Sequence, residues 1–212
     1  MIVNNDEKYF LNGHACEKIN RTRSIKGPCT AFGVVLNDKA IINDRKIVSP
    51  NEYFCIGVSE GEELLITTWP TTIVALFTVR NYVRKNNVLA GTWNELRGDQ
   101  LYIDGCTDTL LICPSKLGDP CLNALYVEPN TTQTEHTHPS LRFGVIVAGA
   151  GSMFKEGVEY SLLPGTVWVI EPNTKHYFKT ADKMLTTIAY HPDSDWGPTD
   201  QVHPMLNKTN II

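Results

Sequence analysis

Short strand-like segments follow one another along nearly the whole chain, and this succession limits the fold more than any other feature. Segments such as "EYFCIGV" (52–58) and "RFGVIVAG" (142–149) are rich in β-branched and aromatic residues, and Gly, Pro, Asn or Asp bound them. Turn signals recur about every 8–12 residues, a spacing typical of β-sandwiches and barrels. Helical periodicity is scarce, and one capping signal, Thr92 with Glu95, suggests a single short helix. The sequence therefore predicts an all-β fold.

A polar, Gly-containing stretch near residues 85–105 separates two strand-rich blocks. This division predicts a β-rich N-terminal half over residues 1–95 and a second domain over residues 96–192. Residues 193–212 are rich in Pro, Asp and Asn, and we expect them to form an extended C-terminal arm. The apolar side chains of such an arm would pack on its own domain or on a partner subunit.

The charge balance excludes several classes of partner. The chain has 212 residues, a formal net charge of −4, and 20% charged residues without a Lys/Arg run. It therefore lacks the basic footprint of nucleic-acid binding and the basic amphipathic stretch of a membrane-surface protein. No apolar run is long enough to span a bilayer, and "MIVNNDEKYF" lacks the pattern of a secretory leader. We expect a cytoplasmic protein with neither nucleic acid nor membrane as a partner.

The six cysteines are expected to be reduced and mostly buried, as is usual in the cytoplasm. No two of them form a C-x-x-C pair. A zinc site that uses Cys106 and Cys113 is the alternative, although their spacing departs from that of the usual zinc knuckles.

Histidines are the candidate metal ligands. His136 and His138 stand two residues apart in "TEHTHPSLRFGVIVAG", so in a strand they would face the same side, and Arg142 shares their parity. His176 follows another predicted strand, "TVWVIE". Three imidazoles from neighbouring strands suit Fe(II), Mn, Ni, Cu or Zn and leave positions open for water or substrate. The alternative is a set of unrelated surface or turn histidines.

The stretch 130–180 resembles the two motifs of the cupin superfamily. The first motif reads G, five residues, H-x-H, three or four residues, E, six residues, G. In this chain it reads Asn130, five residues, His136-Thr-His138, three residues, Arg142, six residues, Gly149. The second motif reads G, five residues, P-x-G, two residues, H, three residues, N. In this chain it reads Gly165, five residues, Glu171-Pro172-Asn173, two residues, His176, three residues, Thr180.

The resemblance implies a cupin double-stranded β-helix, or jelly roll, over residues 96–192. It implies that one divalent transition metal is held by three ligands: His136, His138 and His176. Arg142 stands in the position of the fourth ligand, normally Glu, and a guanidinium cannot ligate a cation. What remains resembles the three-histidine cupins, such as the thiol dioxygenases and diketone-cleaving dioxygenases. Fe(II) is therefore the expected metal, with Mn, Ni, Cu or Zn as alternatives. The N-terminal half is expected to be a second, degenerate cupin barrel or a β-rich decoration of the first.

Arg142 has three interpretations. Its side chain could form a salt bridge on the surface, bind an anionic ligand inside the barrel, or occupy the metal site itself. A planar guanidinium matches a carboxylate or phosphate at two points. A cation next to a divalent metal is unfavourable unless an anion lies between them. We therefore predict that Arg142 is a substrate anchor.

The sequence also predicts where several side chains near the two motifs lie. Phe178 shares the parity of His176 and could line the pocket, whereas Tyr177 faces away. Glu171 is either an acceptor for an imidazole N–H or an exposed carboxylate. The two histidines that precede prolines are expected to be loop residues: His191 and His203.

These features predict a metal-dependent enzyme that acts on a small, anionic molecule by a dioxygenase-type oxidation. One alternative is a non-catalytic cupin that binds or senses a small ligand. Another is a metal-dependent lyase or isomerase, and a structural role is also open. Barrels of this sort often pair through edge strands and exchanged arms, so we expect a homodimer.

Overall fold

The computed structural model describes the chain except for residues 5–6, 94–95, 117 and 194–209. The chain divides into two compact units, Val3–Asn94 and Met1–Ile2 with Glu95–Ile212. Nearly all regular structure is β-strand, which confirms the all-β prediction, and the only helix among the described residues is the 3-10 turn η1 (Ile103–Gly105). No described helix is long and apolar enough to cross a membrane.

The short helix expected near Thr92 is not seen in the described part of the chain. Thr92 is the last residue of β11 (Val88–Thr92), and the proposed capping partner Glu95 lies outside the described residues. Thr92 pairs with Glu52 across an antiparallel ladder, so its backbone groups serve a sheet rather than a helix start.

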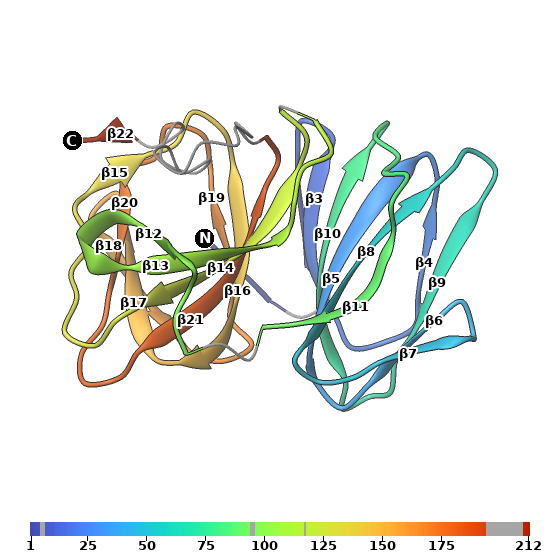
Figure 1. Ribbon diagram of the computed structural model, residues 1–212, viewed down its shortest axis with the longest axis horizontal. Helices are drawn as coiled ribbons and strands as arrows, with labels where there is room; N and C mark the ends of the chain where they lie inside the picture. Colours follow the sequence, from blue (N-terminus) through green and yellow to red (C-terminus); the bar gives the residue numbers. More distant parts are fainter. Residues whose placement is uncertain (5–6, 94–95, 117, 194–209) are drawn as a thin grey trace. The chain divides into compact units, whose positions relative to one another are not determined.

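The N-terminal unit is built from two antiparallel sheets around an apolar core (Figure 1). Among the described residues, the larger sheet has the order β11, β8 (Glu52–Val58), β5 (Cys29–Asn37), β10 (Ile73–Arg80), β3 (His14–Ile19), β2 (Lys8–Leu11). The smaller sheet has the order β4 (Arg23–Lys26), β9 (Glu63–Thr67), β6 (Ala40–Ile42), β7 (Lys46–Val48). Phe54 and Leu76 from the first sheet pack in one cluster with Leu64 and Ile66 from the second. Apolar side chains therefore fill the interior of this unit.

The C-terminal unit repeats the two-sheet plan and forms a jelly-roll barrel (Figure 1). Its larger described sheet has the order β1 (Ile2–Val3), β19 (Val167–Ile170), β16 (Arg142–Gly149), β21 (Leu185–His191), β14 (Cys121–Val127), β13 (Thr107–Ile112), β12 (Gln100–Leu101). The smaller has the order β18 (Val158–Leu162), β17 (Gly151–Lys155), β20 (His176–Lys179), β15 (His136–Thr137), β22 (Asn210–Ile211). Trp168 and Ile146 from the first sheet share a core cluster with Met153 and Phe178 from the second.

Four turns of this unit need left-handed backbone, and they fall on the four glycine positions of the two motifs. Gly149 and Gly165 have φ values of 77° and 88°, and Asn130 and Asn173 each have a φ of 59°. Asn adopts this conformation more readily than other non-Gly residues, so the two Gly-to-Asn departures keep the turn geometry. The turn at Asn173 leads directly into β20, and the turn at Asn130 lies just before β15.

Most of the predicted C-terminal arm, including His203, lies outside the described residues. Its last residues are described: β22 pairs antiparallel with β15, with Ile211 opposite His136 and Asn210 opposite Thr137. The chain end therefore hydrogen-bonds to the short strand that carries the first motif.

Candidate metal centre

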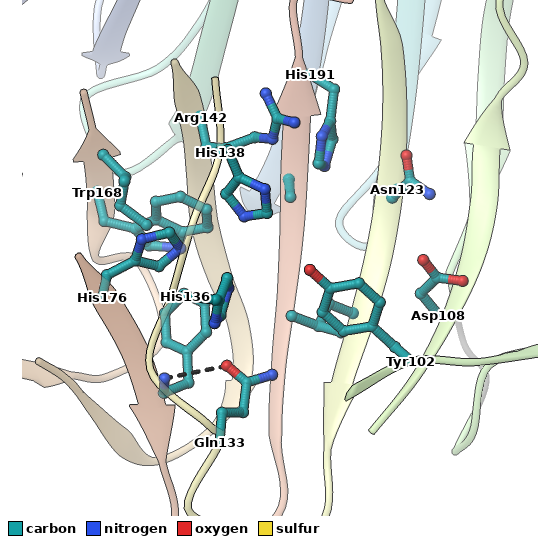
Figure 2. A pocket seen from close by; sticks show the side chains of 14 residues that line it. Tyr102, Asp108, Asn123, Gln133, His136, His138, Arg142, Trp168, His176 and His191 are labelled. Atoms are coloured by element: carbon teal, nitrogen blue, oxygen red, sulfur yellow. Dashed lines mark hydrogen bonds between the residues drawn. The ribbon is translucent and has the colours of Figure 1, made fainter. Parts of the chain in front are cut away.

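The three predicted histidines converge inside the C-terminal barrel (Figure 2). His136 lies in β15, His138 follows that strand, and His176 begins β20 directly opposite His136. The imidazole centroids lie 4.3 Å apart for His136 and His176, 5.0 Å for His138 and His176, and 5.1 Å for His136 and His138. All three side chains are buried, and one ligand atom from each lies within 4.8 Å of the others. Unrelated surface histidines are thereby excluded.

Backbone carbonyls fix the orientation of two of the rings. The Nδ1 atoms of His136 and His176 each lie 2.8 Å from a carbonyl oxygen, that of Thr134 and that of Thr174 respectively. A carbonyl only accepts, so Nδ1 carries the hydrogen and Nε2 keeps its lone pair. This is the usual arrangement behind a metal-binding imidazole. Glu171 does not take this acceptor role, because its carboxylate pairs with Lys155.

Burial keeps the imidazoles neutral. Desolvation lowers the pKa of His176 to about 3, and repulsion from His136 and Arg142 adds to the shift. The pKa of His138 also falls well below its ordinary value, first through burial and then through Arg142. Burial lowers the pKa of His136 in the same direction. Metal ligation requires neutral imidazole, so the cluster fits a divalent transition metal without having to release protons near neutral pH.

Arg142 is buried at the start of β16 and lines the same cavity, with only 2% of its surface exposed. Its Nη1 donates to the carbonyl oxygen of Leu141 at 2.9 Å and to the hydroxyl of Ser140, and it lies 3.6 Å from a carboxylate oxygen of Asp193. The interpretation of Arg142 as a surface salt bridge is therefore wrong. The guanidinium also does not occupy the histidine cluster, because its Nη1 is held by groups of its own strand end and of Asp193. Figure 2 shows the guanidinium pointing away from the three rings.

The residues that line the cavity with the histidines all belong to the C-terminal unit. Phe178 lines it as predicted, whereas Tyr177 stacks on Phe154 with the ring centroids 4.7 Å apart. The apolar part of the lining is formed by Leu125, Trp168, Ile170, Phe178 and Ala189. The polar part, beyond the three histidines and Arg142, is formed by Tyr102, Asp108, Asn123, Gln133 and His191.

The expectation that His191 is a loop residue is wrong. It is the last residue of β21, is 3% exposed, and pairs with Cys121 of β14. The strand continues up to the residue before Pro192, so His191 keeps the inward parity of Ala189. That parity was the signal available in the sequence.

No motif marks the other polar residues of the wall. Gln133 serves the fold, since its Oε1 accepts the backbone N–H of Phe178 at 3.1 Å and its Nε2 approaches the sulfur of Cys106 at 3.3 Å. Asp108 and Asn123 lie on the adjacent strands β13 and β14.

The zinc alternative is not borne out in the described part of the chain. The histidine cluster is the only group of His, Cys, Asp or Glu ligands there that is close enough to hold a metal. Cys106 is buried beside Gln133, and Cys113 is exposed. All six cysteines are free thiols, five of them buried, as expected.

Comparison with known proteins agrees with the architecture. Residues 125–189 match the model of the Cupin domain, whereas no curated protein matches the chain. A cupin 2 conserved barrel domain protein from Leptotrichia buccalis is 11% identical, with a TM-score of 0.60 over 91% of this chain and 88% of that one.

Two further solved structures have similar folds. Salicylate 1,2-dioxygenase from Pseudaminobacter salicylatoxidans is 8% identical, with a TM-score of 0.61 over 93% of this chain and 74% of that one. AerE from Microcystis aeruginosa is 12% identical, with a TM-score of 0.61 over 86% and 89%. Identities this low speak for the fold alone. The barrel, the two motifs and the family match over residues 125–189 together identify a cupin domain in the C-terminal unit.

Proposed function

We propose that the protein is a metal-dependent cupin enzyme that oxidises a small anionic molecule with dioxygen. The observation that carries the proposal is the convergence of His136, His138 and His176, buried and neutral, in one cavity. The fold of a salicylate 1,2-dioxygenase supports it, and a variant of that enzyme has been solved in complex with gentisate. The three histidines are the proposed ligands of one divalent metal, with Fe(II) preferred over Mn, Ni, Cu or Zn.

The residues around the cavity would have separate roles in the reaction. A divalent iron with three neutral nitrogen ligands supplies redox chemistry toward dioxygen and a full double charge that attracts an anion. The carbonyls of Thr134 and Thr174 hold two imidazoles with Nε2 free to bind. Trp168 and Phe178 form an apolar wall that excludes water, which strengthens the attraction between buried charges.

Arg142 is the proposed substrate anchor. It lines the cavity with a buried positive charge, and its Nε has no hydrogen-bond partner among the described residues. Nη1 is already held by Ser140, Leu141 and Asp193, so the anchor acts through the remaining part of the guanidinium and through its charge. An anion between Arg142 and the metal would be attracted by both.

Metal analysis tests the proposal. Protein purified without a nickel column should contain about one iron per chain, because three imidazoles in a fixed array favour a transition metal. The variant His176→Ala should lose the metal, whereas His14→Ala, a histidine of the other unit, should keep it. Oxygen consumption with a panel of small carboxylic acids then tests the oxidation. Wild-type protein without stoichiometric metal would contradict the proposal.

A non-catalytic binding or sensing cupin is the second candidate, and Arg142 in the fourth-ligand position favours it. Such a protein would bind a small acid in the barrel, and the bound acid would raise the melting temperature of the protein. It would consume no oxygen. A metal-dependent lyase or isomerase would instead turn over the acid under nitrogen. Product analysis with and without oxygen therefore separates these classes.

We also propose that the protein is a homodimer. In the described five-stranded sheet, β22 and β18 are the outer strands, and outer strands offer backbone groups for pairing with a second copy. Light scattering during gel filtration should give twice the mass of one chain, and a monomer would contradict the proposal.

A further inference from the structure

The cavity has a second polar cluster, distinct from the histidines. Asp108 on β13 and Asn123 on β14 line it, and each is 1% exposed. Both strands belong to the seven-stranded sheet, whereas β15 and β20, which carry His136 and His176, belong to the other sheet. In Figure 2 the two side chains lie on the side of the cavity formed by β13 and β14, and the histidines lie on the other. Tyr102, which also lines the cavity, lies between the histidines and Asp108 in this view, so a small molecule bound at the metal would reach the pair by extending past Tyr102.

The strand register places the two side chains next to each other. Asp108 pairs with Leu125, and Leu110 pairs with Asn123, so Asp108 and Asn123 are diagonal neighbours on one face of the sheet. Leu125, the direct partner of Asp108 and two residues from Asn123 on β14, also lines the cavity. Diagonal neighbours in antiparallel strands are typically about 7–8 Å apart, so two polar side chains there can reach one ligand group.

Asn123 offers a buried donor that the protein itself does not use. Its Oδ1 lies 3.4 Å from the sulfur of Cys121, which can donate its S–H to it. This contact orients the amide, and among the described residues Nδ2 has no hydrogen-bond partner. Buried amide donors are nearly always paired in folded proteins, so an unpaired one in a cavity wall indicates a ligand that accepts from it.

Asp108 offers hydrogen-bond acceptors instead of a donor. An ionised carboxylate only accepts hydrogen bonds, so it favours a ligand group that donates. A carbonyl at this place would satisfy Asn123 but repel the carboxylate, and an ammonium would do the reverse. A hydroxyl is the smallest group that can accept from Asn123 and donate to Asp108 at the same time.

We propose that Asn123 and Asp108 bind a hydroxyl group of the substrate, and that the substrate class is therefore a small hydroxylated carboxylic acid. The assignment of a carboxylate to the substrate rests on the proposed function, because that group would lie toward the metal and Arg142. The hydroxyl end rests on the Asn123–Asp108 pair alone. The two residues thus determine specificity, since an acid without the hydroxyl leaves both of them without their ligand partner.

The test uses full-length protein loaded with Zn(II), which binds acids without oxidising them. Isothermal titration compares lactate with propionate and salicylate with benzoate, two pairs that differ by one hydroxyl. In the wild type, at least one hydroxylated acid should bind about 10- to 100-fold more tightly than its deoxy partner, the range expected for hydrogen bonds that involve a charged group. Asn123→Leu removes the donor and Asp108→Asn removes the charge of the acceptor, and both keep side-chain volume, so each should lower that ratio.

Both variants should keep the zinc content of the wild type and the affinity for the deoxy acid, and the exposed control Asp182→Asn should change nothing. An affinity ratio that is unchanged in both variants would mean that the metal or another group recognises the hydroxyl, and it would overturn the inference. So would equal binding of both members of each pair, or binding of none, by zinc-loaded wild type. If the wild type retains no metal, the proposed function fails, and the same titrations on metal-free protein still decide whether the pair selects the hydroxyl.

Discussion

His136 and His176 face each other across the ladder between β15 and β20, and each ring is held by the carbonyl oxygen of the residue two positions earlier. The two imidazoles thus have the same support from their own backbone, at Thr134 and at Thr174. Because the turns before the two strands fix where these carbonyls point, the ligand geometry exists before a metal arrives. Preorganisation of this kind lowers the cost of binding, since few side-chain rotations have to be lost.

Metal addition should therefore stabilise the protein. A metal that binds only the folded state, at 100 times its dissociation constant, adds about 2.7 kcal/mol, which corresponds to a rise in melting temperature of about 5–10 °C for a chain of this size. Differential scanning fluorimetry with and without Co(II) measures it. The variant His138→Ala should show no rise, because two imidazoles bind a metal far more weakly than three, and chelator should return the wild type to the lower value. An equal rise in the variant would place the metal elsewhere.

The candidate site was predictable from the sequence because each ligand follows a turn with a recognisable residue. Asn130 and Asn173 take the left-handed backbone that glycine takes in the family motifs. The spacing from these turns to His136 and His176 therefore still predicts the positions of the ligands. The segments 52–58 and 142–149 likewise form strands with the predicted ends, β8 and β16. Their runs of apolar residues leave no competing periodicity.

The other parts of the cavity wall could not be predicted, because they depend on which strands become neighbours. On β21 the buried Thr187 has a partner that is distant in the sequence, since the indole N–H of Trp168 donates to its hydroxyl at 3.0 Å. Asp108 and Asn123 become parts of one wall only through the pairing of β13 with β14. Long-range pairing of this kind leaves no local pattern in a single sequence.

The substitution Gly144→Ala should disturb the cavity wall. A Cβ at this position would lie 2.1 Å from the ring of Trp168, so the indole has to move and its hydrogen bond to Thr187 breaks. We expect a loss of stability of about 1–3 kcal/mol, typical of an overpacked core, and a change in tryptophan fluorescence. Urea unfolding measures the loss. The double variant Gly144→Ala with Trp168→Phe should recover part of it, and strictly additive losses would argue against the clash.

Alkaline pH should destabilise the protein through buried thiols. Burial raises the pKa of Cys55 to about 12 and that of Cys106 to about 11, from an ordinary value near 9. Above pH 9 the unfolded chain releases these protons and the folded chain retains them, so stability is complete below pH 9 and falls as pH rises toward 11. Each thiol contributes a slope of up to about 1.4 kcal/mol per pH unit in that window. Urea midpoints at pH 8 and pH 10 should differ less in Cys106→Ala, whereas Cys113→Ala, which removes an exposed thiol, should behave as the wild type.

Removal of residues 210–212 should weaken metal binding without unfolding the barrel. β22 pairs with β15 at His136, and the N–H of Ile212 donates to the carbonyl oxygen of Glu135 at 3.1 Å. β15 has only two residues, so without β22 one edge of it is freed and His136 loses part of its support. Support of a ligand by neighbouring groups is typically worth 10- to 100-fold in metal affinity, and we expect about 10-fold here. Competition with a chromophoric chelator measures it. The variant Ile211→Ala is the matched control, because the pairing uses only backbone atoms and the Ile211 side chain is 59% exposed. An equal loss in this control would assign the effect to the side chain instead of the strand, and unchanged affinity after truncation would show that β20 alone positions His136.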